Sequence, residues 1–184
     1  MILIVGLGNP GKEYKNTRHN VGFIILDDIL KDINWEKSSK GKLLYYRDSD
    51  IEYIKPQTFM NESGLSVSYV QKKHELNSEN IIVIHDDIDL PFSQIKISYD
   101  RGDGGHNGIK SIMNHLKSQS FVRVRVGVSI LDENNILRKP DVLGTFSKND
   151  LEIIKEKISP SVHEVIQMII TEGKEIAMNK FNIK

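Results

Sequence analysis

The sequence predicts an α/β protein of one domain, in which helices flank a mixed central β-sheet. Short apolar runs rich in β-branched residues alternate along the chain with segments whose apolar residues recur at helical spacing. A chain of 184 residues can bury one good core, and no repeat, low-complexity tract or linker divides it. We therefore expect a single catalytic domain over residues 1–184.

Four strands are expected in the first half of the chain, at residues 2–5, about 43–47, about 51–55 and 81–84. The last of them is an unbroken apolar run between polar residues, as is typical of a central strand. Helical spacing begins at Val21, where Asn20 is expected to supply the N-cap. A second helix opens at residues 61–63 and is expected to end near His74.

The second half of the chain continues the alternation. A strand is expected at residues 94–98, a flexible loop at 100–108, a helix at 109–116 and a strand at 122–128. Valine occupies every second position of the last strand, so one face is apolar while the other carries Arg123 and Arg125. A capping box at Ser147 and Asp150 opens one helix, and Pro160 suits the first turn of the last helix.

Composition limits the classes of function. The chain has no cysteine, which excludes disulfides and thiolate chemistry and suits the cytoplasm. Its start lacks a basic segment and stays apolar for only four residues after Met1, so we expect neither a signal peptide nor a membrane partner. With 25 basic and 25 acidic residues it is not an indiscriminate nucleic-acid binder, and a polyanion would need a local basic patch.

The organising stretch of the chain is GLGNPG at residues 6–11, followed by Tyr14 and by TRHNVGF at residues 17–23. The glycines match a dinucleotide-binding fingerprint, but that motif needs a helix to begin among them. The polar residues after Gly11 show no helical spacing, which disfavours a dinucleotide. The stretch instead delivers Asn9 and His19 to the carboxyl edge of a sheet, where ligands bind in open α/β folds.

The whole pattern resembles that of the bacterial peptidyl-tRNA hydrolases. Three later segments match the same family in order: KPQTFMNESG at residues 55–64, HDDIDLP at 85–91 and GGHNG at 104–108. The resemblance implies an enzyme that cleaves the ester between a peptide and tRNA. It also implies peptidyl-tRNA and its acceptor arm as partners, no cofactor or metal, and a monomer.

Carried over by position, the resemblance assigns five catalytic residues: His19 as base, Asp86 as its orienting carboxylate, and Asn9, Asn61 and Asn107 as positioners of substrate and water. An imidazole can take a proton from water, and a carboxylate on its other nitrogen fixes the tautomer. Among the amides, Asn107 is expected to face the oxyanion and Asn61 the peptide backbone.

Four further residues are assigned to substrate binding by the resemblance: Tyr14, Phe59, Met60 and Arg125. Phe59 and Met60 would line a peptide groove, although a packing role is as well supported for apolar side chains. Arg125 would contact phosphate, while for Arg123 a solvated strand face is the competing interpretation. Residues 98–103 are poorer in glycine than is common in the family, so a phosphate contact there rests on Lys96 and Arg101.

Two other classes of function stay open at this point. His85, Asp86, Asp87, Asp89 and His106 could form the metal cluster of a metal-dependent hydrolase, although their spacing matches no common metal motif. A non-catalytic RNA-binding module is the third possibility.

Overall fold

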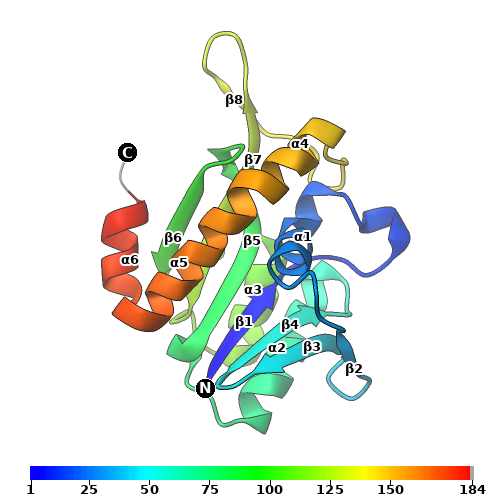
Figure 1. Ribbon diagram of the computed structural model, residues 1–184, viewed down its shortest axis with the longest axis vertical. Coiled ribbons are helices and arrows are strands. Elements are labelled where there is room, and N and C mark those ends of the chain that lie inside the picture. The colour runs from blue at the N-terminus through cyan, green and yellow to red at the C-terminus, as the bar shows by residue number, and fades with distance from the viewer. Residues whose placement is uncertain (183–184) are drawn as a thin grey trace.

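The computed structural model describes residues 1–182 and contains one mixed sheet (Figure 1). Residues 183–184 of the predicted domain lie outside the described part. The strands are β1 (Ile2–Gly6), β2 (Glu36–Ser38), β3 (Leu43–Asp48), β4 (Ile51–Pro56), β5 (Ile81–Pro91), β6 (Ile95–Tyr99), β7 (Val122–Leu131) and β8 (Leu137–Arg138). Their order is β2-β3-β4-β1-β5-β7-β6, with β8 on β7. The central strands β4, β1, β5 and β7 are parallel, and the outer pairs are antiparallel.

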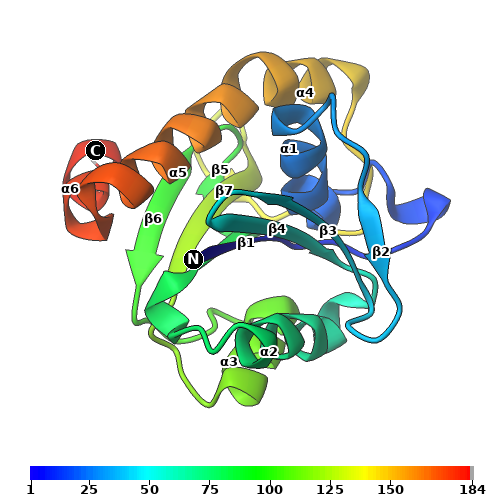
Figure 2. The same cartoon turned by 60° about the horizontal axis from the view of Figure 1, so that its bottom comes forward.

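Helices cover both faces of this sheet, which confirms the predicted architecture. They are α1 (Val21–Ile29), α2 (Ser63–Lys73), α3 (Asn107–Leu116), α4 (Lys148–Ile153), α5 (Ser159–Glu172) and α6 (Lys174–Phe181). Figure 2 shows α1, α4 and α5 over one face, and α2 and α3 under the other. No helix within residues 1–182 is long and apolar enough to cross a membrane.

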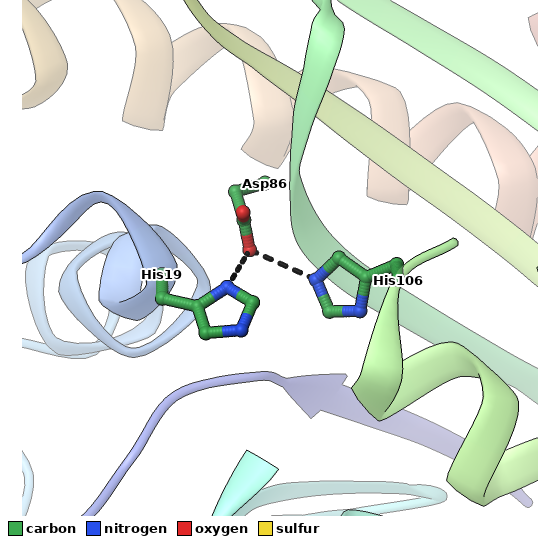
Figure 3. A group of neighbouring side chains, drawn as sticks. All are labelled: His19, Asp86 and His106. Atoms are coloured by element: carbon green, nitrogen blue, oxygen red, sulfur yellow. Dashed lines mark hydrogen bonds and ion pairs between the residues drawn. The ribbon is translucent and has the colours of Figure 1, made fainter. Parts of the chain in front are cut away.

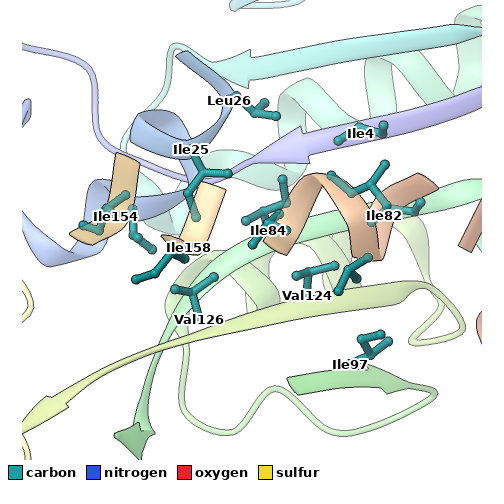
Figure 4. Packing of buried hydrophobic residues seen from close by; sticks show 14 of the residues in the cluster. Ile4, Ile25, Leu26, Ile82, Ile84, Ile97, Val124, Val126, Ile154 and Ile158 are labelled. Atoms are coloured by element: carbon teal, nitrogen blue, oxygen red, sulfur yellow. The ribbon is translucent and has the colours of Figure 1, made fainter. Parts of the chain in front are cut away.

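Strand alternation divides the core into two clusters. In β1, Ile4 faces the layer of α1 and α5, while Leu3 and Val5 face α2 and α3. Figure 4 shows the first cluster, in which Ile4 and Ile84 pack near helical residues such as Ile25. Full burial of each such side chain contributes about 1.5–3 kcal/mol, so the central strands are rigidly held.

The strands continue further than the apolar runs indicate. Residues 81–84 were expected as a strand with acidic residues beyond it, but β5 extends to Pro91. The reason is pairing: Asp86 lies opposite Val126 and Asp87 opposite Gly127 on β7. At Gly127 a Cβ would lie 1.9 Å from the Pro91 carbonyl oxygen, so only glycine permits this close approach.

The prediction that the helix with Pro160 is the last one is wrong. Pro160 does lie in the first turn of α5, but Gly173, with φ 95°, ends α5 and α6 follows. Asn182, just after α6, bonds the backbone of Ile97 twice, donating to its carbonyl and accepting from its N–H at 2.8 Å each. These bonds pair the outer edge of β6.

Candidate active site

The site lies where β1 and β5 end side by side. Gly6, the last residue of β1, is in register with Ile84 on β5, and Asp86 follows two residues later. After β1 the chain makes two 3₁₀ turns, Lys12–Tyr14 and Arg18–Asn20, before α1 begins. No α-helix opens among residues 6–11, as expected, and His19 lies just before α1, next to Asp86.

A distant segment fixes the backbone of His19. The His19 N–H donates to the carbonyl of Val142 at 2.8 Å, and the Arg18 N–H donates to that of Gly144 at 3.1 Å. Thr17 forms an isolated bridge with Thr145. The predictions made from the sequence did not include this support, because only backbone groups form it and no side-chain pattern marks it.

His19 and Asp86 form a buried pair. The Nδ1 atom of His19 lies 2.8 Å from Oδ1 of Asp86 (Figure 3). Asp86 is only 2% exposed to solvent. Because a carboxylate only accepts, Nδ1 of His19 carries the proton. Nε2 of a neutral His19 is then left with a lone pair, which a general base requires.

His106 makes a second bond to the same carboxylate oxygen, with its Nε2 atom 2.9 Å from Oδ1 of Asp86 (Figure 3). The other ring nitrogen, Nδ1, accepts hydrogen bonds from the N–H groups of Gly108 and Ile109, so that His106 is the N-cap of α3. Since Nδ1 accepts, the proton of the neutral ring is on Nε2. The start of a helix thus sets the tautomer in which His106 donates to Asp86.

These two donors decide the ionisation of Asp86. Burial alone would raise the pKa of this carboxyl group, but His106, and then His19, stabilise the charged form. The net effect holds the pKa of Asp86 well below its usual range. Asp86 is therefore a carboxylate throughout the neutral pH range and can stabilise an imidazolium at His19.

The same three side chains could in principle hold a metal, because their ligand atoms lie within 4.8 Å of one another. The donor set fits poorly, however. A metal on Nε2 of His106 needs a lone pair there, but the N–H groups of α3 already occupy the lone pair on Nδ1. Both nitrogens would have to be unprotonated, or the helix cap would be lost.

The metal cluster considered from the sequence is not assembled as such. His85 packs edge to face on His106, with 4.7 Å between ring centroids, but its Nδ1 donates to the Asp86 carbonyl at 2.7 Å and so carries a proton. Asp87 pairs with Arg125 at 2.6 Å, and Asp89 with Lys139 at 2.6 Å. Burial holds the pKa of His85 well below its usual range, so this ring is neutral.

Asn9 is held at both its backbone and its side chain. Asn20 is the N-cap residue of α1, as expected, but its side chain makes no capping bond: its carboxamide instead accepts from the Asn9 N–H and donates to the Asn9 carbonyl, at 2.9 Å each. Oδ1 of Asn9 accepts from the Met60 N–H at 2.7 Å. The amide of Asn9 therefore presents Nδ2, a donor, as its free group.

The other two asparagines are exposed, and neither side chain makes a hydrogen bond within residues 1–182. Asn107 is the first residue of α3, directly after His106, and lines the cleft beside His19. Asn61 lies in the turn Met60–Glu62 that begins at the residue bonded by Asn9. Both side-chain amides can therefore donate hydrogen bonds to a substrate.

The aromatic and apolar residues assigned to substrate binding differ in how far they are exposed to solvent. Phe59 is 55% exposed and meets Tyr14 edge to face, with 6.3 Å between ring centroids. Met60 is 4% exposed and belongs to the core cluster under α3, where its sulfur fills the space beside Gly108. A packing role therefore fits Met60 better than the groove role expected of it.

The two arginines of β7 differ sharply. Arg125 lines a cleft of about 560 Å³ that also contains His19, Lys96 and Arg101. Its Nε binds Asp87, which leaves the two terminal nitrogens without a partner among residues 1–182. Arg123 was expected to point outward or toward the cleft. It does line the same cleft, but it is only 3% exposed, so the solvated interpretation is wrong.

Known proteins resemble this chain over its whole length. A family model described as Peptidyl-tRNA hydrolase matches residues 3–184. A protein of that name from Clostridium beijerinckii is 44% identical, covering 99% of this chain and 96% of its own, and one from Finegoldia magna is 41% identical, covering 100% and 98%. The crystal structure of peptidyl-tRNA hydrolase from Acinetobacter baumannii has a TM-score of 0.85 at 29% identity, covering 99% of this chain and 94% of that one.

Replacing Asp86 by Asn tests its ionisation. A group whose pKa is lowered by folding stabilises the native state above its ordinary pKa of 3.8, and this contribution is lost as the pH falls below that value. We expect Asp86→Asn to lower the free energy of unfolding by about 1.5–3 kcal/mol at pH 7. The difference should shrink by about 1 kcal/mol between pH 5 and pH 3 in urea titrations. A difference that stays constant would mean that Asp86 titrates normally.

Proposed function

The chain belongs to the peptidyl-tRNA hydrolase family, and on that basis we propose that it cleaves its substrate with a water molecule activated by His19. The reaction is hydrolysis of the ester between the peptide and the tRNA. The observation that carries the assignment is the buried carboxylate of Asp86, which accepts hydrogen bonds from two imidazoles.

In the proposed mechanism, Nε2 of His19 removes a proton from water as the oxygen attacks the ester carbonyl. The imidazolium that forms is stabilised by Asp86, which is already ionised and needs no reorganisation. The proton then passes to the departing ribose oxygen, so His19 returns to its starting state. The residue acts first as base and then as acid, and no metal is needed to generate the nucleophile.

The carbonyl oxygen becomes negative during attack and needs donors. Asn9 offers only Nδ2, because its oxygen is bonded to the Met60 N–H, and Asn107 offers a free amide at the start of α3. We assign the oxyanion to Asn107, with Asn9 positioning the substrate and Asn61 the peptide backbone. Loss of one such donor typically costs about 3–4 kcal/mol of transition-state stabilisation.

The surroundings of His19 suggest where each half of the substrate lies. The cleft holds cations of Lys96, Arg101 and Arg125 that could contact phosphates of the acceptor arm of tRNA, beside the aspartates of β5, whereas Tyr14 and exposed Phe59 suit the peptide. The asparagine side chains of the site are neutral. They suit a substrate whose nitrogen nearest the ester is an amide rather than a charged amino group. We propose that the enzyme acts as a monomer in the cytoplasm, where translation supplies its substrate.

The role of His19 is tested by His19→Ala. Loss of the base should reduce turnover of an N-blocked aminoacyl-tRNA by about 10²–10⁴-fold, while tRNA binding stays the same and the protein still folds, with a lower free energy of unfolding because Asp86 loses one donor. His163→Ala, at an exposed position of α5, is the control and should keep full activity. Near-normal turnover by folded His19→Ala protein would refute the mechanism.

The role of Arg125 is tested through salt. If its terminal nitrogens contact one phosphate, Arg125→Ala should weaken tRNA binding and flatten the slope of log affinity against log salt by about 0.7–0.9. Cleavage of a minimal ester without the tRNA body should barely change, because the catalytic groups are untouched. Lys72→Ala, in the last turn of α2, is the control. An unchanged slope would place the phosphate elsewhere.

A further inference from the structure

Arg123 is a buried cation that the mechanism above does not use. Its guanidinium donates to the carbonyl of Gly102 through Nη1 at 2.6 Å and to the carbonyl of Arg101 through Nη2. It also lies over the ring of Phe121, 4.7 Å from the centroid. Burial lowers the pKa of Arg123 to about 10, so the group is still charged at neutral pH.

The two carbonyls belong to a segment with little packing of its own. This segment, residues 100–105, joins β6 to His106 and α3. A Cβ added at Gly102, Gly104 or Gly105 would meet no atom within 4 Å, so these positions are open to solvent. The remaining side-chain bonds are an internal one within the segment and one from Ser120 to Asp100 at 3.2 Å. Arg123 is therefore its main attachment to the sheet.

What the segment leads into is the catalytic site. His106 and Asn107 follow it directly, and His106 must keep its ring against Asp86 at 2.9 Å. A fork of two parallel donors restrains a backbone more strongly than a single flexible ammonium does. Displacement of catalytic groups by about 1 Å can cost on the order of 100-fold in rate.

We propose that Arg123 is a positioning residue, which holds residues 101–102 against β7 and thereby keeps His106 and Asn107 in place. This inference rests on the proposed function of the Asp86 site. Arg125 provides the natural comparison, because it is two residues away on the same strand face and lines the same cleft but binds the side chain of Asp87 instead of the loop. One arginine supports the loop, and the other faces the substrate.

The experiment compares Arg123→Lys and Arg123→Met with Arg125→Met by amide hydrogen exchange and steady-state kinetics. The two Arg123 variants should exchange the hydrogen-bonded amides of Gly105 and His106 at least about 10-fold faster while β5 stays protected. Their kcat on N-blocked aminoacyl-tRNA should fall by about 10- to 100-fold, with KM changed less than about threefold. Lys, which supplies one donor site instead of a fork, should recover only part of the loss.

Arg125→Met should show the opposite pattern, with a raised KM and normal exchange in residues 101–106. Unchanged exchange in both Arg123 variants would overturn the proposal that Arg123 holds residues 101–102 against β7. Faster exchange with normal kcat would overturn the positioning role. Because exchange is measured without substrate, a failure of the His19 assignment would leave the loop result intact, so the two failures are distinguishable.

Discussion

The structure of the site depends on one buried oxygen, Oδ1 of Asp86, which accepts hydrogen bonds from His19 and His106. A carboxylate that is 2% exposed would be costly without such partners, because burial removes its hydration. Two donors offset that cost and keep the group ionised. The consequence is a fixed negative charge beside His19 that does not need to form during the reaction.

Each donor reaches this oxygen by a different structural route. His19 is placed by the turn after β1, with its backbone held by the carbonyl of Val142. His106 is placed by helix α3, whose first N–H groups take up Nδ1 and turn the Nε2 proton toward Asp86. The parallel pairing of β1 and β5 brings the turn that carries His19 beside Asp86. The same tautomer makes His106 a poor metal ligand, because Nε2, the nitrogen that faces Asp86, carries a proton.

Local patterns in the sequence predicted the central strands and the principal helices, because strand ends and helical spacing are local properties, while the pairing of His19 with Asp86 came from the family resemblance. They did not predict the length of β5, since its polar half is held by pairing with β7 rather than by apolar burial. The role of Asn20 was missed because a carboxamide that could cap a helix bonds Asn9 instead. His106 was considered only as a metal ligand, although its place before α3 could have marked it as a cap.

The central claim concerns protons, and ¹⁵N NMR of the imidazole side chains observes them directly. The account predicts the tautomer of each neutral ring: His106 carries its proton on Nε2, and His19 and His85 carry theirs on Nδ1. Long-range proton–nitrogen correlations distinguish the two tautomers, and His106→Asn and His19→Asn identify the signals. A His106 ring protonated at Nδ1 would contradict the account, because Asp86 would then have lost its second donor.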